Sequence, residues 1–330
     1  IDNHHVKIQK SNDETKTIYA ENIIIATGSK PRTIPNIDVD EKIIMTSDGV
    51  DHMKSFPKSM VIVGAGVIGC EYATIFSNFG KTKVYLIDRS DRILPFEDTD
   101  ISDMISKNLK EKGVTIHNKA QLERLEVKDG EVEYELSYKD GKKEIIRVEK
   151  ALLSVGRKLC IDGLKMENAG VTLSKRGVHI GDINTQTNIP NIYVVGDASG
   201  HISLVNVGEL EGRYAVERMF SKKYYPLNYK NICTIMFLQP EVASVGINEK
   251  TCIEENIPVK VVKLDYSCIA RAIAMRKTEG FFKIIVTDDK KMKILGMRAV
   301  GEHASSAIQA VALLMKMDKG IEELAEMIYP

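Results

Sequence analysis

A glycine-rich turn between an apolar strand and a helix constrains this chain more than any other feature. The motif Gly64-Ala-Gly66-Val-Ile-Gly69 follows the apolar run Met60 to Val63 and opens a helix expected over about Cys70 to Phe79. Gly64 permits a tight turn, Gly66 lets the backbone approach a pyrophosphate, and Gly69 lets the helix pack closely on the strand. The helix N-terminus also presents unpaired N–H groups to an anion. The pattern predicts a dinucleotide site; the alternative is a turn used only for packing.

The strand after this helix ends in an acidic residue, Asp88, about 20 residues beyond the glycines. An ionised carboxylate there accepts hydrogen bonds from ribose hydroxyls and repels a 2′-phosphate, so the pattern favours NAD over NADP. Arg89 and Arg92 keep NADP open, because either side chain could reach a phosphate. Without a nucleotide, Asp88 is simply an exposed acid in a turn.

Apolar periodicity predicts an α/β unit around this motif. A strand over Lys83 to Ile87 and a helix near Ile101 to Lys112 complete a βαβ pattern. The runs Val114 to Ile116, Leu122 to Val127 and Val132 to Tyr138, with turns at Asp129-Gly130 and Asp140-Gly141, predict a small antiparallel meander.

The last hundred residues mix strand-like and helix-like segments, which predicts an α+β unit with an antiparallel sheet. The expected strands are Glu241 to Gly246, Val259 to Leu264, Gly280 to Val286 and Lys293 to Val300. The expected helices are Asn248 to Glu255, Ala304 to Met317 and Ile321 to Met327.

Charge and cysteine content exclude several functional classes. Forty-six basic residues balance 46 acidic ones, which argues against a nucleic-acid or membrane-surface protein. The longest apolar runs fall far short of the about 20 residues of a membrane span. The five cysteines show neither the spacing of a disulfide scaffold nor that of a zinc site, so we expect no metal and a cytoplasmic location.

Two further turns follow buried strands. Thr27-Gly28 ends the run Asn22 to Ala26, and Asp197 ends the run Asn191 to Gly196, the position where ligands bind in open parallel sheets. Asp197 could equally be the N-cap of the helical segment after Ala198.

The order of these motifs resembles the flavoprotein disulfide reductases, and among them the dihydrolipoyl dehydrogenases. The resemblance rests on Glu21-Asn-Ile-Ile-Ile-Ala-Thr-Gly-Ser29, Val61-Ile-Val-Gly-Ala-Gly-Val-Ile-Gly-Cys-Glu71, Ser154-Val-Gly-Arg157 and Val195-Gly-Asp-Ala198. It continues through Pro240-Glu-Val-Ala-Ser-Val-Gly246, Gly280-Phe-Phe-Lys283 and Ile294-Leu-Gly-Met297.

This resemblance implies a division of the chain. Rossmann-like FAD- and NAD-binding domains, with the NAD domain inserted in a split FAD domain, would precede an α+β dimerisation domain. We expect residues 1–45 and 156–227 to be parts of the FAD domain, 46–155 the NAD domain and 228–330 the dimerisation domain of a homodimer.

The resemblance also implies which residues contact the cofactors FAD and NAD. Thr27 and Gly28 would lie beside the flavin, and Asp197 would bond its ribityl chain. On the NAD side, Gly156 would touch the nucleotide and Glu71 would face the nicotinamide; otherwise Glu71 is a carboxylate favoured by the helix dipole. The remaining cofactor residues would be Val67 and Ile68 in the glycine motif and Ser203, Leu204, Val205 and Asn206 near the isoalloxazine. At Val205-Asn206 the family usually has Ala-His.

The implied activity is oxidation of dihydrolipoamide, with hydride passing through FAD to NAD. Such a protein serves a 2-oxo acid dehydrogenase complex in some settings. The chemistry needs a dithiol and a His held by Glu, but no two cysteines here lie five positions apart and no His is followed by Glu five residues later. We therefore assign no catalytic residue. We expect a fragment whose redox cysteines precede Ile1 and whose His-Pro pair follows Pro330, with Cys70 a packing residue.

Other members of the family share this domain order. A soluble transhydrogenase, a mercuric reductase or a coenzyme A disulfide reductase would act on another disulfide or dithiol substrate or acceptor. A different class is a non-catalytic module that binds NAD and dimerises.

Overall fold

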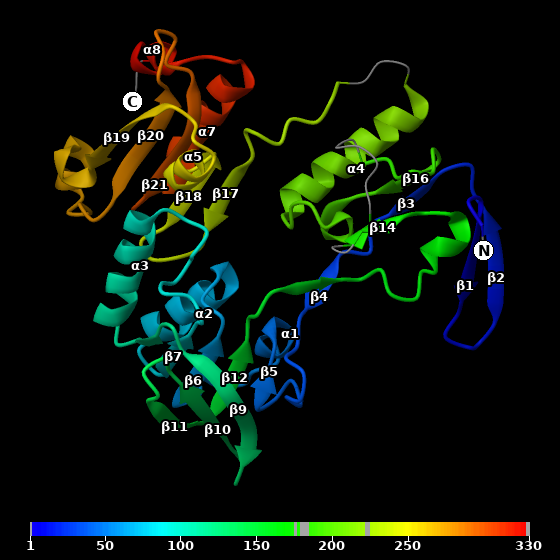
Figure 1. The fold of residues 1–330 in the computed structure, drawn as a ribbon, viewed down its shortest axis with the longest axis horizontal. Helices are drawn as coiled ribbons and strands as arrows, with labels where there is room; N and C mark the ends of the chain where they lie inside the picture. The colour runs from blue at the N-terminus through cyan, green and yellow to red at the C-terminus, as the bar shows by residue number, and fades with distance from the viewer. Residues whose placement is uncertain (1, 175–176, 179–184, 222–224, 328–330) are drawn as a thin grey trace. The chain divides into compact units, whose positions relative to one another are not determined.

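The computed structural model describes residues 2–174, 177–178, 185–221 and 225–327. The chain divides into two compact units. The first unit contains Ile1–Lys30 and Arg157–Asn228, and the second contains Pro31–Gly156 and Tyr229–Pro330. Each unit is thus assembled from two segments that lie far apart in the sequence (Figure 1).

A five-stranded parallel sheet carries the glycine motif in the second unit. Its order is β5 (Ile44–Met45), β12 (Lys150–Leu153), β6 (Ser59–Val63), β7 (Lys83–Ile87) and β8 (Thr115–His117). Helices α1 (Ser47–Val50), α2 (Val67–Asn78) and α3 (Thr99–Glu111) connect these strands. Strand β6 is apolar without alternation because a parallel sheet is covered on both faces, and Met60, Val61 and Ile62 are fully buried. The predicted βαβ unit is confirmed.

The predicted meander is only partly correct. Its strands are β9 (Gln121–Lys128), β10 (Glu131–Ser137) and β11 (Lys143–Val148), all antiparallel. The Asp129-Gly130 turn has φ values of 54° and 82°, as a tight hairpin requires. However, of the run Val114 to Ile116, Thr115 and Ile116 belong to β8 of the parallel sheet rather than to the meander. A three-residue run is too short for its periodicity to show which sheet it joins.

The C-terminal part of the second unit holds an antiparallel sheet of five strands. Their order is β17 (Cys233–Met236), β18 (Val242–Gly246), β21 (Ile294–Val300), β20 (Phe281–Thr287) and β19 (Val259–Asp265). Four of them were predicted, whereas the short, half-exposed β17 was missed. The helices there are α5 (Glu249–Glu254), α6 (Ala270–Ala274), α7 (Ala304–Lys316) and α8 (Ile321–Ala325), with the turn η3 (Tyr266–Cys268).

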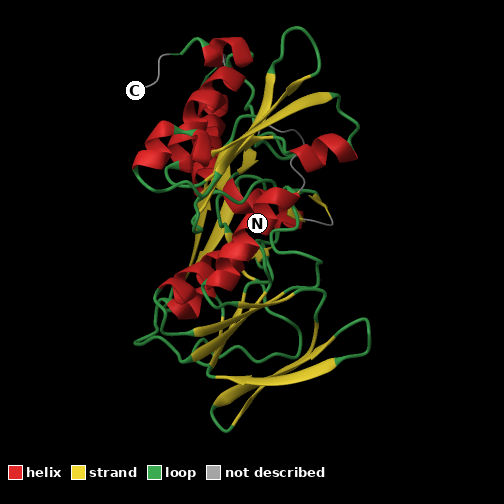
Figure 2. Ribbon diagram, turned by 90° about the vertical axis from the view of Figure 1, so that its left-hand side faces the viewer, coloured by secondary structure: helices red, strands yellow, loops and turns green. Residues whose placement is uncertain are grey.

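The two faces of this antiparallel sheet pack differently (Figure 2). Helix α7 covers one face, where Ala243, Met297 and Ile308 share a core. On the other face, Phe281 and Val300 belong to the same core as Met60 and Ile62 of the parallel sheet. The two sheets of the second unit are therefore joined by continuous apolar packing.

The first unit brings two distant strands together. Strand β3 (Ile23–Ile25) pairs in parallel with β16 (Ile192–Val194), and the turn η2 (Gly196–Ser199) and helix α4 (Val205–Phe220) follow β16. The hairpin of β1 (His5–Gln9) and β2 (Thr15–Tyr19) precedes β3. Its smaller elements are η1 (Met166–Ala169), β13 (Arg157–Leu159), β14 (Leu173–Ser174) and β15 (Gly177–Val178), and β4 (Ser29–Pro31) runs from it into the second unit.

Candidate functional site

A cavity of about 930 Å³ opens at the carboxyl edge of the parallel sheet in the second unit. Six residues predicted from the sequence to bind a cofactor line it: Gly64, Gly66, Val67, Ile68, Asp88 and Gly156. Because β6, β7 and β12 are parallel neighbours, the turns after them meet at one edge. The sheet thus brings together residues separated by up to 92 positions in the sequence.

The three motif glycines are required for different reasons. Gly64 has a φ of 103°, and a Cβ there would lie 2.5 Å from the Ser154 carbonyl oxygen. A Cβ on Gly69 would lie 1.9 Å from the Gly64 carbonyl oxygen, so only glycine lets α2 approach β6 this closely. A Cβ on Gly66 would meet no atom within 4 Å. Protein packing therefore explains Gly64 and Gly69, while Gly66 borders the cavity with room for a ligand.

The Asp88 carboxylate is fixed by two main-chain N–H groups. Ala65 N donates to Oδ2 at 2.7 Å, and Ser90 N donates to Oδ1 at 2.8 Å. Each oxygen keeps a lone pair for a further donor such as a ribose hydroxyl. Asp88 is thus an ordered, cavity-lining acceptor rather than an exposed turn acid.

Arg89 and Arg92, the two arginines that could reach the 2′-phosphate of NADP, differ in position. Arg92 donates from Nη1 to Thr99 Oγ1 at 2.7 Å and from Nη2 to the Glu97 carbonyl oxygen at 3.1 Å. These bonds hold its guanidinium within its own loop, and Arg92 does not line the cavity. Arg89 is exposed and does line it. Arg89 is therefore the arginine placed to meet a 2′-phosphate.

The remaining predicted residues of this helix, Gly69 and Glu71, do not line the cavity. Glu71 Oε1 accepts a hydrogen bond from Phe237 N at 2.9 Å, and burial raises the pKa of its carboxyl. Glu71 thus joins the nucleotide unit to the antiparallel region, a contact that the sequence did not reveal.

Cys70 lies beside Glu71 and is fully buried. Burial raises the pKa of its thiol, so a thiolate is disfavoured there. This agrees with the predicted packing role.

Several cavity residues were not predicted. They come from the segment Arg32 to Ile37, from Pro95 and Phe96, and from Leu122 to Glu126 on β9. Ser154 belongs to the motif Ser154-Val-Gly-Arg157 but was not predicted as a site residue; its hydroxyl donates to the Val63 and Gly64 carbonyl oxygens at 2.9 and 2.8 Å. The loop residues among them carry no periodic signal, and the alternation on β9 predicts a strand without showing that it borders a cavity. The sequence therefore could not identify them.

In the first unit, the turns after β3 and β16 meet in a charged cluster. Ser29 Oγ donates to Asp197 Oδ2 at 2.5 Å, and Arg157 Nε donates to Ser29 Oγ at 2.6 Å. Arg157 Nε lies 3.6 Å from Asp197 Oδ2. Thr27 and Gly28 immediately precede Ser29; Gly28 has a φ of 69°, and a Cβ there would have no atom within 4 Å. The two strand ends therefore lie side by side.

Asp197 does not cap a helix through its side chain. It lies inside η2, whose N-cap is Val195 and makes no side-chain capping bond. Its carboxylate is held by Ser29 and Arg157 instead. Ser29 and Arg157 were not predicted as site residues.

The segment Ser203, Leu204, Val205 and Asn206 enters α4, with Leu204 as its N-cap and Val205 91% exposed. Helix α4 is held near Asp197 by Glu211, whose Oε2 accepts from Gly196 N at 2.7 Å. A Cβ on Gly208 would lie 3.0 Å from Gly196 Cα, which shows how closely the helix approaches the turn.

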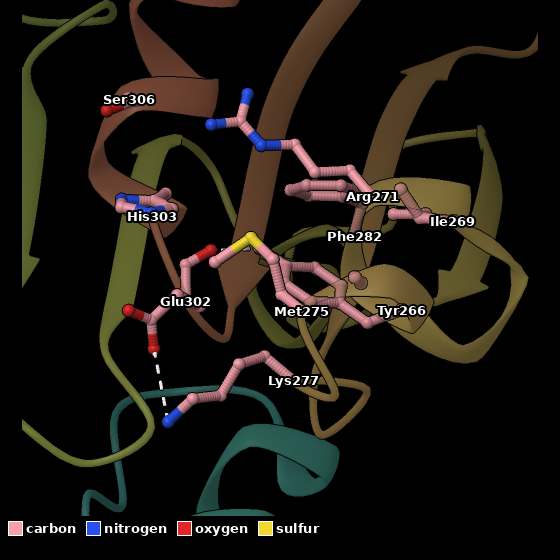
Figure 3. A pocket seen from close by; sticks show the side chains of 10 residues that line it. Tyr266, Ile269, Arg271, Met275, Lys277, Phe282, Glu302, His303 and Ser306 are labelled. Carbon is pink, nitrogen blue, oxygen red and sulfur yellow. Dashed lines mark hydrogen bonds and ion pairs between the residues drawn. The ribbon is translucent and has the colours of Figure 1, made fainter.

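A smaller cavity of about 300 Å³ lies in the antiparallel region, next to the start of α7 (Figure 3). Tyr266, Met275 and Phe282 form an apolar wall, and Lys277 Nζ lies 4.0 Å from Glu302 Oε2. None of the residues predicted to bind cofactors lines this cavity.

The part of the chain that the structure describes carries no metal or membrane signature. There, no group of three or more His, Cys, Asp or Glu side chains is arranged to hold a metal ion. Nor does any helix of those residues combine the length and apolar character needed to cross a bilayer.

Comparison with known proteins agrees with this geometry. Residues 1–212 match the pyridine nucleotide-disulphide oxidoreductase family, and residues 232–330 match its dimerisation domain. Dihydrolipoyl dehydrogenase of Bacillus subtilis is 32% identical over 98% of this chain and 68% of its own length. The enzyme of the same name from Chlamydia trachomatis is 33% identical over 100% of this chain and 69% of its own length. The chain thus spans about two thirds of these relatives.

Solved structures show the same fold. The HOCl-induced flavoprotein disulfide reductase RclA of Escherichia coli superposes with a TM-score of 0.88 at 27% identity, covering all of this chain and 74% of that one. LpdA of Mycobacterium tuberculosis, at 24% identity, has a TM-score of 0.90 over 99% of this chain and 70% of its own. The α/β fold predicted from the sequence, with nucleotide-binding and dimerisation domains, is confirmed. The chain belongs to the pyridine nucleotide-disulphide oxidoreductases, the FAD-dependent and NAD-linked disulfide oxidoreductase family.

Proposed function

We propose that this chain carries the NAD site and part of the flavin site of an enzyme that oxidises dihydrolipoamide, or a related dithiol, with NAD as the final acceptor. One observation carries the proposal: Gly66, Asp88 and Gly156 line a single cavity at the carboxyl edge of a parallel sheet. The relatives named dihydrolipoyl dehydrogenase favour the dihydrolipoamide substrate over those of other family members.

The residues around the cavity fit a dinucleotide. Gly66 leaves room for a pyrophosphate at the N-terminus of α2, where unpaired N–H groups favour an anion. Asp88 is oriented to accept ribose hydroxyls, and Gly156 presents backbone without a side chain. Val67 and Ile68 continue the cavity lining along the first turn of α2. Glu71 lies one turn further along α2 and bonds Phe237 N, so its proposed place on the nicotinamide side is outside the cavity lining.

The strand-end cluster fits the polar part of a flavin. Ser29 and Arg157 hold the Asp197 carboxylate in one orientation, so it can accept a hydroxyl donor without first being ordered. Thr27, Gly28 and the segment Ser203 to Asn206 would lie beside the flavin ring. When bound, FAD supplies the hydride transfer between dithiol and NAD.

The dithiol step is not assigned to a residue of this chain. No two of its cysteines lie five positions apart, and Cys70 is buried with a raised thiol pKa. We assign catalysis to none of the five cysteines.

The proposal also covers the domain boundaries, the oligomeric state and the assembly of the protein. The FAD domain expected at residues 1–45 and 156–227 is proposed here as residues 1–30 and 157–228, because β5 joins the parallel sheet and residues 32–37 line its cavity. Residues 31–156 would form the NAD domain and 229–330 the dimerisation domain of a cytoplasmic homodimer. Assembly with a 2-oxo acid dehydrogenase complex is part of the same proposal and follows from the lipoamide substrate alone.

Nucleotide binding tests this proposal directly. The chain should bind NADH, measured by the fluorescence of the nucleotide, and Gly66→Val should abolish binding while leaving the thermal unfolding temperature unchanged. NADH oxidation by the native protein, purified from its source, should require lipoamide rather than coenzyme A disulfide. A chain that does not bind NADH, or a native protein that does not oxidise NADH with lipoamide, would contradict the proposal. Preference for coenzyme A disulfide would favour a coenzyme A disulfide reductase instead.

A further inference from the structure

One wall of the nucleotide cavity is formed by a short loop between β7 and α3. Pro95 and Phe96 line the cavity there, and Phe96 is 48% exposed. The residues on either side are buried: Leu94 is fully buried and Glu97 is 5% exposed. We refer to Pro95–Asp98 as the wall segment.

Within its own domain, the wall segment is bonded mainly at its C-terminal end. Glu97 N donates to the Leu94 carbonyl oxygen at 3.0 Å, and the Asp98 carbonyl oxygen accepts from Ile101 N and Ser102 N at 3.2 Å. Leu94 N donates to the Ala65 carbonyl oxygen at 2.8 Å, just before the segment. Arg92 Nη2 reaches the Pro95 and Glu97 carbonyl oxygens at 3.5 and 3.1 Å. None of these bonds reaches the Phe96 carbonyl oxygen.

The dimerisation domain supplies further contacts through the start of α5. Lys250 Nζ donates to the Pro95 carbonyl oxygen at 2.8 Å, and Asn248 Nδ2 donates to the Phe96 carbonyl oxygen at 2.9 Å. These two bonds hold the main chain of the residues that line the cavity. A backbone held at consecutive carbonyls has little freedom to move its side chains toward or away from the ligand.

Buried ion pairs anchor the end of the wall segment more deeply. Arg298 Nε lies 3.0 Å from Glu97 Oε2, and both side chains are 6% exposed. Lys283 Nζ lies 2.8 Å from Asp98 Oδ2, with side-chain exposures of 2% and 4%. Replacing one member of such a pair strongly destabilises the fold, because the other member is left as an uncompensated buried charge. The anchor is therefore firm, and Asn248 and Lys250 extend it to the cavity edge.

We propose that Asn248 and Lys250 are positioning residues for NAD, through which the dimerisation domain holds Pro95 and Phe96 in the shape that receives the nucleotide. This inference rests on the proposed NAD site. The two residues touch no ligand themselves; they order a wall that binding would otherwise have to order.

Two substitutions test the positioning role of Asn248 and Lys250 without removing their contribution to the stability of the fold. Lys250→Met removes the bond to Pro95 and keeps the apolar stem of the side chain. Asn248→Ser removes the bond to Phe96 and keeps a capping hydroxyl for α5, whose cap is now Asn248 Oδ1 accepting from Thr251 N at 2.8 Å. Each should raise the Kd for NADH about three- to tenfold, the factor that one hydrogen bond is worth. Lys250→Arg should restore the affinity.

Two control substitutions each remove one charge from the same domain without touching the wall segment. Lys260→Met breaks the 3.1 Å pair with Asp288 on the same domain, and Glu254→Gln removes a carboxylate that lies 3.8 Å from Lys250 Nζ. Neither touches the wall segment, so neither should change the Kd. The thermal unfolding temperature is recorded for every variant.

The chain has no tryptophan, which allows a direct readout of the wall. Phe96→Trp places a single tryptophan at the cavity, which can be excited apart from the tyrosines. Its fluorescence anisotropy without nucleotide should fall when Asn248→Ser and Lys250→Met are added. An unchanged Kd and anisotropy in that combined variant would overturn the inference, as would an equal rise in Kd for Lys260→Met. Failure of the unsubstituted chain to bind NADH would instead overturn the proposed NAD site, and the positioning role with it.

Discussion

The Asp88 carboxylate accepts a 2.7 Å hydrogen bond from the N–H of Ala65, so the acid that ends β7 is tied to the glycine turn that follows β6. In the proposed NAD site, this bond fixes the position of the Asp88 carboxylate relative to the glycine turn. Because a negative charge at the ribose repels a 2′-phosphate, the proposal makes the choice between NAD and NADP depend on Asp88.

Asp88→Ala should narrow the preference for NADH over NADPH by about 1–3 kcal/mol, the scale of a charged hydrogen bond. Asp91→Ala is the matched control, since Asp91 is an exposed neighbour that does not line the cavity. Titration of both nucleotides against both variants measures the change. Equal affinities in the unsubstituted chain would show that Arg89, which lines the cavity, controls the choice.

Replacing each of the three motif glycines by alanine should affect either stability or NADH affinity, depending on the position. Gly64→Ala and Gly69→Ala place a Cβ 2.5 and 1.9 Å from backbone oxygens, so both should lower the free energy of unfolding by several kcal/mol. Gly66→Ala meets no atom and should unfold like the parent while binding NADH at least about tenfold more weakly. Thermal unfolding beside NADH titration separates the two effects. A stable Gly69→Ala variant would mean that α2 can move off β6.

Acid should weaken the junction between α3 and the antiparallel sheet. Burial alone would raise the pKa of Asp98, but hydrogen bonds from Lys283 and from the N–H groups of Lys250 and Glu249 outweigh burial and lower it below 3.8. A lowered folded pKa means that ionised Asp98 stabilises the fold above pH 3.8, and that this contribution is lost as the pH falls through the folded value.

Asp98→Asn should therefore cost about 1.5–3 kcal/mol between about pH 5 and 7. The difference from the parent should shrink as the pH falls below 3.8. Urea unfolding at several pH values measures this, with Asp103→Asn, an exposed acid of the same helix, as the control. A pH-independent difference would show that Asp98 contributes through packing and not charge.

The 330 residues by themselves should bind NADH, hold FAD weakly and fail to reduce lipoamide. The sequence has one complete GxGxxG turn, which is assigned to NAD. The pyrophosphate of FAD would therefore lack the charge-assisted hydrogen bonds of such a turn, worth about 1.5–3 kcal/mol each. Desalting the chain after incubation with FAD and recording the absorbance at about 450 nm measures how much FAD is retained. A yellow chain that reduces lipoamide with NADH would show that residues assigned to packing take part in catalysis.

Local features of this protein were readable from the sequence because they depend on neighbouring residues. The turn at Gly64 to Gly69 and the hairpin at Asp129-Gly130 need backbone angles that glycine and aspartate allow, and both formed where predicted. Apolar periodicity likewise predicted β6, α2 and most of the antiparallel sheet. Asp88 was recognised by its spacing from the glycines.

Tertiary packing decided the rest, because it joins residues whose separation leaves no local pattern. Whether Val114 to Ile116 joined the meander or the parallel sheet depended on which edge was unpaired, and it paired with β7. Ser29 meets Asp197 across 168 positions, and Asn248 meets Phe96 across 152. A hydrogen bond between such residues exists only after several strands and helices have packed. The sequence by itself therefore determined the glycine turn at the cavity edge, while the packed domains determined the position of Pro95 and Phe96 in the same cavity.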